Sequence, residues 1–129
     1  MKVIFYESPF YHVRSKYEEA REALIKLGVE DIRVARMTEE VDRVLSLDKI
    51  NFVLVHFDGK AIALQELIRN HPEVRFFAYS AFTEEKGIQG SIGELIETSI
   101  METGVEGIIR NFEQDLSRVV HNLRGEERR

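Results

Sequence analysis

Asn-Phe-Val-Leu-Val-His-Phe-Asp-Gly, at residues 51–59, is the most informative stretch of this sequence. Its apolar residues run almost without interruption, which is typical of a strand that is covered on both faces. The run ends at His56, and the first acidic side chain, Asp58, follows two positions later. A buried strand with polar side chains at its carboxyl end predicts an α/β sheet with a site at the strand ends.

The rest of the chain alternates between strand-like and helix-like apolar patterns. Short apolar runs predict five strands, at Lys2–Tyr6, Asp31–Arg36, Ile50–Phe57, Val74–Tyr79 and Gly107–Ile109. Each run is followed by apolar residues at helical spacing, and two of these helices are expected to end near Gly28 and Gly104. Because parallel strands need a crossover between them, five such units predict a parallel sheet. The expected fold is α/β, a flavodoxin-like (βα)5 three-layer sandwich with strand order 2-1-3-4-5.

Length and composition limit the class of protein. The chain has 129 residues, 43% of them hydrophobic and 32% charged, which fits one globular domain. We assign this domain to residues 1–124 and a polar tail to residues 125–129. The net charge of −5 argues against nucleic acid, and no apolar run approaches the roughly 20 residues that cross a membrane. Without cysteine or a signal peptide, the chain is expected in the cytoplasm.

Polar side chains follow several of the predicted strands. In a sheet with this strand order, a site forms beyond the carboxyl ends of the strands. The residues at these places are Glu7, Ser8, His56, Asp58, Ser80, Ala81, Arg110 and Asn111. We therefore expect them to share one edge of the domain.

This arrangement resembles the receiver domain of bacterial two-component response regulators, the CheY-like family, over Lys2–Leu123. Ser80-Ala81 matches the Ser or Thr followed by Ala after the family's fourth strand, and Gly104–Gly107 matches its Gly-x-x-Gly before the fifth. The resemblance implies a phospho-acceptor aspartate at the end of the third strand. It also implies an acidic pair that holds Mg²⁺ after the first strand and a lysine after the fifth.

The chain departs from the family at most of these positions. His56 stands in the acceptor place, Glu7-Ser8 stands in place of the acidic pair, and the lysine is replaced by Arg110 or by Asn111, depending on the count. Histidine cannot form an acyl phosphate, and a hydroxyl adds no charge to a Mg²⁺ site. We therefore predict a vestigial phosphorylation pocket without catalytic residue or cofactor, made of Glu7, Ser8, His56, Asp58, Ser80, Arg110 and Asn111.

These residues also have structural explanations. A histidine at a strand end is often only hydrogen-bonded within the fold, and Glu7-Ser8 could cap the first helix. If Arg110 replaces the lost charge of Mg²⁺ and lysine, its guanidinium is expected between Glu7 and Asp58, where it would form a bridge across the old pocket.

Two other functions stay open. A bulge would bring Asp58 to the acceptor place, since a shift of two residues keeps a side chain on the same face of a strand. The chain would then be a working receiver with Mg²⁺ held by Glu7 and Asp58.

The second alternative function is that of a small flavodoxin-like enzyme or ligand-binding protein, whose pocket is closed by the glycine-bearing loop Ser80–Gly93. The sequence gives this alternative no support, because no glycine-rich run that could bind a phosphate follows the first strand. The loop could equally be a partner-binding element or a tolerated insertion.

The favoured function is a receiver-like protein-interaction module that works without phosphorylation and is not an enzyme. The fifth strand is expected at a sheet edge, and Ile108 stands where the family has its switch aromatic, so this face should keep one conformation. Its expected residues are Ile96, Ile100, Ile108, Leu116 and Val120. It would bind a protein partner or a second copy in a two-fold dimer. The competing explanation is a monomer whose last two helices only cover the core.

Overall fold

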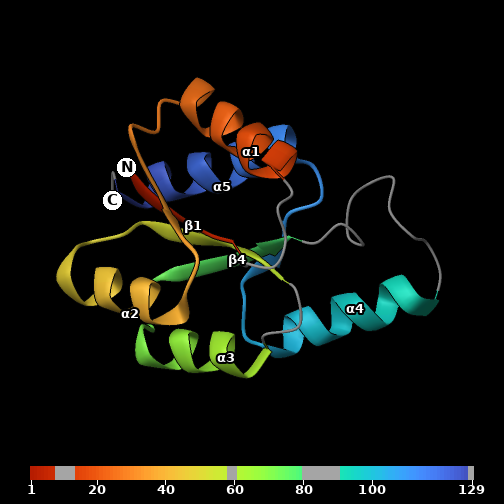
Figure 1. The fold of residues 1–129 in the computed structure, drawn as a ribbon. Helices are drawn as coiled ribbons and strands as arrows, with labels where there is room; N and C mark the ends of the chain where they lie inside the picture. Colours follow the sequence, from red (N-terminus) through yellow and green to blue (C-terminus); the bar gives the residue numbers. More distant parts are fainter. Residues whose placement is uncertain (8–13, 58–60, 80–90, 128–129) are drawn as a thin grey trace.

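A computed structural model of the chain shows strands and helices in strict alternation (Figure 1). It describes residues 1–7, 14–57, 61–79 and 91–127. The strands are β1 (Lys2–Tyr6), β2 (Asp31–Ala35), β3 (Phe52–His56), β4 (Arg75–Tyr79) and β5 (Gly107–Ile108). The helices are α1 (Arg14–Lys26), α2 (Thr38–Leu47), α3 (Ala61–Asn70), α4 (Ser91–Glu102) and α5 (Phe112–Glu127). Within these ranges, no helix is both long enough and apolar enough to cross a membrane.

The strands form one parallel sheet in the order β2-β1-β3-β4-β5. Helices α1 and α5 cover one face of the sheet, whereas α2, α3 and α4 lie on the other (Figure 1). Each helix returns the chain so that the next strand can run in the same direction. The predicted three-layer α/β sandwich of flavodoxin-like topology, with this strand order, is confirmed.

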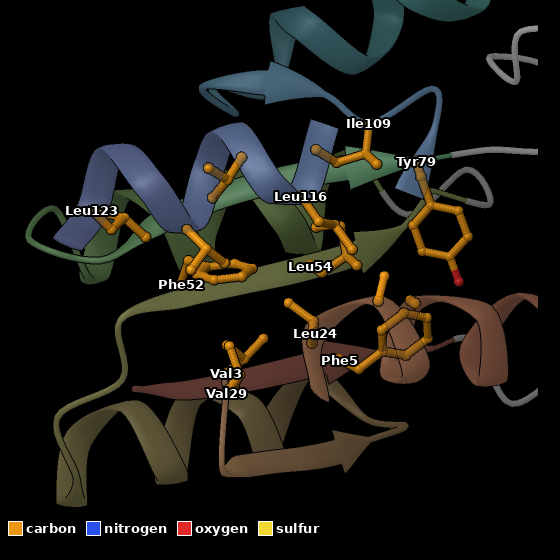
Figure 2. Packing of buried hydrophobic residues seen from close by; sticks show 14 residues of the cluster. Val3, Phe5, Leu24, Val29, Phe52, Leu54, Tyr79, Ile109, Leu116 and Leu123 are labelled. Carbon is orange, nitrogen blue, oxygen red and sulfur yellow. The ribbon is translucent and has the colours of Figure 1, made fainter. Parts of the chain in front are cut away.

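The period-two alternation of strand side chains divides the interior into two cores. In β3, Phe52 and Leu54 face α1 and α5, whereas Val53 and Val55 face α2 and α3. Figure 2 shows the first core, in which Leu116 of α5 lies over Leu54 of the sheet. Because β3 is buried along its whole length, its sequence is apolar almost throughout.

Two of the C-terminal elements differ in length from the prediction. Helix α5 continues through Gly125 to Glu127, past the point where we placed the start of a polar tail. Glu126 forms an ion pair with Arg75 at the start of β4, which joins the last turns of α5 to the sheet. Strand β5 has only two residues, and Ile109 is buried just beyond it.

A charged cluster joins the amino ends of β1 and β2 to the end of α2. Asp48, just after α2, accepts hydrogen bonds from Lys2 Nζ at 2.9 and 3.0 Å and from Arg33 at 2.8 Å. Arg33 also donates to both carboxylate oxygens of Asp31 at 3.1 Å. The hydrogen bonds from Lys2 and Arg33 lower the pKa of Asp48 from 3.8 to about 2.

Acid is therefore expected to weaken this fold partly through Asp48. A carboxylate with a depressed pKa in the folded chain stabilises the fold fully above its unfolded pKa and loses this stabilisation as the pH falls through the folded value. For Asp48 this window runs from 3.8 down to about 2. We expect the Asp48→Asn variant to be less stable than the wild type at neutral pH and to lose less stability across the window. Urea denaturation at neutral pH and at both ends of the window measures this.

Glu30→Gln, at an exposed position before β2, is the matched control and should follow the wild-type profile. Parallel stability profiles for the wild type and Asp48→Asn would contradict the role given to this carboxylate.

Candidate functional site

The structure describes four of the seven residues predicted for the pocket. These are Glu7, His56, Arg110 and Asn111, whereas Ser8, Asp58 and Ser80 lie outside the described residues. Strands β1 and β3 are neighbours, with Tyr6 opposite Val55, so Glu7 and His56 come to the same carboxyl edge of the sheet. Glu7 is buried, and its N–H donates to the carbonyl of Ala35 at 2.9 Å, which extends the pairing of β1 with β2.

His56, which the sequence predicts to stand in the acceptor place, is part of an aromatic stack. The register of the sheet pairs it with Tyr79, so the last residues of β3 and β4 lie side by side. Their rings stack with centroids 4.9 Å apart and planes 19° apart. His56 is only 7% exposed. The end of β3 is therefore packed as part of the core.

Tyr79 connects this stack to the core beneath α1 and α5 (Figure 2). Its ring centroid lies 5.5 Å from that of Phe5 and 5.1 Å from that of Phe112, which it meets edge to face. Phe5 in turn meets Tyr17 of α1 at 5.0 Å. Such pairs add about 0.5–1.5 kcal/mol each beyond the burial of their surface. The sequence does not predict this cluster, because the register of β3 with β4, which places Tyr79 beside His56, is a property of the tertiary structure.

Asn111, one of the two candidates for the lysine position, caps a helix. Its Oδ1 accepts a hydrogen bond from the N–H of Gln114 at 3.0 Å, the geometry of an N-cap residue. The carboxylate of Asp115 accepts from the N–H groups of Arg110 and Asn111 at 2.8 and 3.0 Å. These bonds satisfy backbone donors at the start of α5. They fix the turn between β5 and α5.

Arg110, the other candidate for the lysine position, is paired with a helix. The sequence predicts its guanidinium between Glu7 and Asp58, and Asp58 lies outside the described residues. Within the described residues, Arg110 forms an ion pair with Glu97 of α4. The hydrogen bond from Arg110 lowers the pKa of Glu97. Because the Arg110 side chain is 44% exposed, solvent screens this pair, and a stabilisation of about 0.2–1 kcal/mol is typical. The main effect of the pair is to tie α4 to the end of β5.

Three of the five residues predicted for an interaction face are core residues. Ile100 and Leu116 are 0% exposed and Val120 is 1% exposed. Leu116 and Val120 pack under α5, and Ile100 packs under α4 in the other core. Ile96 and Ile108 are partly buried against that second core. This assignment is wrong for the three buried residues, because the apolar stripe of an amphipathic helix faces the core.

The surface between α4 and β5 is nevertheless hollowed into an open groove, which we call the α4–β5 groove. It is lined by Glu94, Glu97, Thr98, Met101, Glu102, Ile108 and Arg110. Met101 is 45% exposed, and Leu95, on a neighbouring part of α4, is 67% exposed. Helix α4 carries three glutamates and no basic residue. The groove is therefore acidic, with apolar side chains open to solvent.

A metal centre is not formed by the described part of the pocket. Among the described residues, no three His, Asp or Glu side chains lie close enough together to hold an ion. Glu7 brings one carboxylate to the carboxyl edge. The second carboxylate that the sequence predicts for this edge, that of Asp58, lies outside the described residues.

Similarity to known proteins lies in the fold. No protein-family model matches the sequence, and no curated protein matches it. Several solved structures have a similar fold. The response regulator receiver domain protein (CheY-like) from Methanospirillum hungatei JF-1 superposes with a TM-score of 0.66 at 11% identity, over 99% of this chain and 98% of its own. A CheY-like protein from Pseudomonas aeruginosa PAO1 gives 0.68 at 10% identity, over 95% and 99% of the two chains.

A third similar structure belongs to an atypical orphan response regulator, described as revealing a new phosphorylation-independent regulatory mechanism. Its TM-score is 0.62 at 13% identity, over 99% of this chain and 96% of the other. The chain has the fold of a CheY-like receiver domain. At these identities the similarity fixes the receiver fold, whereas the function has to come from the residues at its site.

Proposed function

We propose that this chain is a receiver-like signalling domain that binds a protein partner without being phosphorylated. The observation that carries the proposal is the buried stack of His56 on Tyr79 in the acceptor place. Transfer of a phosphoryl group to a receiver needs an accessible carboxylate oxygen and a divalent cation beside it. A buried imidazole ring supplies neither.

The two residues at the lysine position support the same conclusion. The resemblance to receiver domains implies a lysine at this position, whose positive charge contacts the phosphorylated aspartate. Here the side-chain oxygen of Asn111 caps α5, and the guanidinium of Arg110 pairs with Glu97. Both side chains therefore stabilise the unmodified fold, Asn111 as a helix cap and Arg110 through an ion pair. Accordingly, we assign no catalytic residue and no cofactor to this chain.

The partner surface in this proposal is the α4–β5 side of the domain. It combines an open groove with exposed apolar side chains, Met101 and Leu95, which suit a protein contact. The pair between Arg110 and Glu97 ties α4 to β5 while the chain is unmodified. Because this surface already has its binding conformation in the unmodified chain, a partner protein can bind it constitutively, without a phosphorylation step.

The phosphorylation pocket is the point at which the proposal is tested first. We expect incubation with acetyl phosphate and Mg²⁺ to leave the intact mass of the protein unchanged, because His56 offers no acyl-phosphate chemistry. We also expect beryllofluoride with Mg²⁺ to leave the amide spectrum unchanged. A well-behaved receiver domain in the same reaction serves as the positive control.

A phosphate mass increment that disappears in the Asp58→Asn variant would contradict the proposal. It would identify the chain as a working receiver, with Asp58 as acceptor and Glu7 as a Mg²⁺ ligand.

A further inference from the structure

We infer that the α4–β5 groove binds a basic segment of a partner protein, with apolar side chains at the centre of the segment. This inference rests on the proposed function, because it names the chemistry of the partner at the same surface. Its basis is the arrangement of charge and apolar surface along the groove.

Carboxylates stand at both ends of the stretch of α4 that lines the groove. Glu94 and Glu102 are eight residues apart, which places them about 12 Å apart along the helix axis. Met101 of α4 and Ile108 of β5 add apolar surface to the same groove. A segment with two cationic side chains about two helical turns apart and apolar residues between them would match this pattern.

The ion pairs among the described residues involve one of the three glutamates in the groove. Arg110 pairs with Glu97. Among the described residues, neither Glu94 nor Glu102 takes part in an ion pair. Two carboxylates separated by about 12 Å cannot share one metal ion. Separate cationic groups of a protein segment can meet both.

A second copy of the chain is a poorer occupant of this groove. A two-fold contact places the same surface on both sides of the interface. With two α4 helices antiparallel, Glu94 of one copy would face Glu102 of the other, and α4 has no basic residue to compensate. Like charges placed across an interface suppress binding. Charge therefore favours a different protein that carries lysine or arginine.

A pair of synthetic peptides tests the inference on the full chain. The probe is a fluorescein-labelled amphipathic helical peptide of Lys, Leu and Ala, and its control has Glu in place of each Lys. We expect the lysine peptide to raise the fluorescence anisotropy at low salt and the glutamate peptide to have no effect. Amide and methyl chemical shifts should change around Met101 and Ile108 on addition of the lysine peptide.

Two charge-reversed variants separate the groove from net charge. E94K/E102K is expected to weaken binding of the lysine peptide by about tenfold or more, since two close attractive contacts become repulsive. E18K/E22K makes the same change of charge at exposed positions of α1 and should leave the affinity within about threefold. Circular dichroism melts confirm that both variants are folded.

Several results would overturn the inference. Equal loss in both variants would show that only net charge attracts the peptide, and shift changes away from α4 and β5 would place the site elsewhere. Equal binding of the glutamate peptide would show that basic groups are not needed. A dimer in light scattering that E94K/E102K dissociates would make the second copy the occupant. The test with acetyl phosphate measures only phosphorylation. A failure of the proposed function can therefore be distinguished from a failure of this inference about the groove.

Discussion

Replacing Leu116 with alanine is expected to lower the free energy of unfolding by about 2–5 kcal/mol, the range for losing a fully buried leucine. Leu116 is 0% exposed and packs between α5 and the sheet in the core shared with Leu54 and Phe5 (Figure 2). The cavity left by the missing methyl groups adds to the lost transfer free energy because a packed core relaxes only in part. Urea denaturation followed by circular dichroism measures the loss.

The matched change at the surface is Met101→Ala, on the wall of the α4–β5 groove. Because Met101 is 45% exposed, we expect a change in stability of only about 0.5 kcal/mol. The two variants should also differ in binding. Leu116→Ala, while folded, should keep its affinity for the lysine peptide, whereas Met101→Ala should weaken it. Wild-type stability in Leu116→Ala would contradict the packing of α5, and unchanged peptide affinity in Met101→Ala would remove that side chain from the interface.

This contrast explains why the interaction face could not be read correctly from the sequence. Leu116 and Val120 mark the apolar stripe of α5, and such a stripe identifies the face that a helix buries. The side chains that α4 offers to solvent, Leu95 and Met101, fall outside the stripe containing Ile96 and Ile100. A sequence pattern gives the orientation of a helix. Which exposed residues line a groove depends on the neighbouring strand, and this is a property of the tertiary structure.

The fold was predictable because its signals are local and repeated. Apolar strands alternating with amphipathic helices indicated a parallel sheet, and Gly28 and Gly104 correctly indicated the ends of α1 and α4, where both have positive φ values, 84° and 99°. The end of α5 was harder to predict. A glycine inside a helix is unfavourable by about 1 kcal/mol relative to alanine, so Gly125 suggested a stop. The contact of Glu126 with Arg75, distant in sequence, lies beyond this local rule.

At the candidate site, the positions of residues along the sheet were predictable, whereas their side-chain partners were not. Strand order placed Glu7 and His56 at one edge of the sheet without any knowledge of side-chain contacts. The partners of the charged and aromatic groups were not predictable in this way. Arg110 pairs with a residue on α4, and the ring of His56 stacks on a neighbouring strand. Such contacts depend on the positions of elements that the sequence pattern leaves free.

Placing an aspartate at the end of β3, where CheY-like receivers carry their phospho-acceptor, is expected to destabilise this domain. His56→Asp removes a ring stacked on Tyr79 and puts a carboxylate at a position where the native residue is only 7% exposed. An uncompensated buried charge costs several kcal/mol, on the order of 3, and the lost aromatic contact adds to this. His56→Phe is the matched control, because it keeps an aromatic ring beside Tyr79 and adds no charge. We expect it to lose clearly less stability in urea denaturation at neutral pH.

The pH dependence of the His56→Asp variant identifies the cause of its instability. Burial raises the pKa of a carboxyl group above its unfolded value, so the protonated form is the one that the folded chain tolerates. The destabilisation should therefore be smallest below the unfolded pKa and grow as the pH rises towards the raised value. The His56→Phe control should lack this pH dependence. If His56→Asp is instead as stable as the wild type at neutral pH and takes up phosphate in the presence of Mg²⁺, the end of β3 is a polar acceptor site, and the buried stack does not exclude phosphorylation.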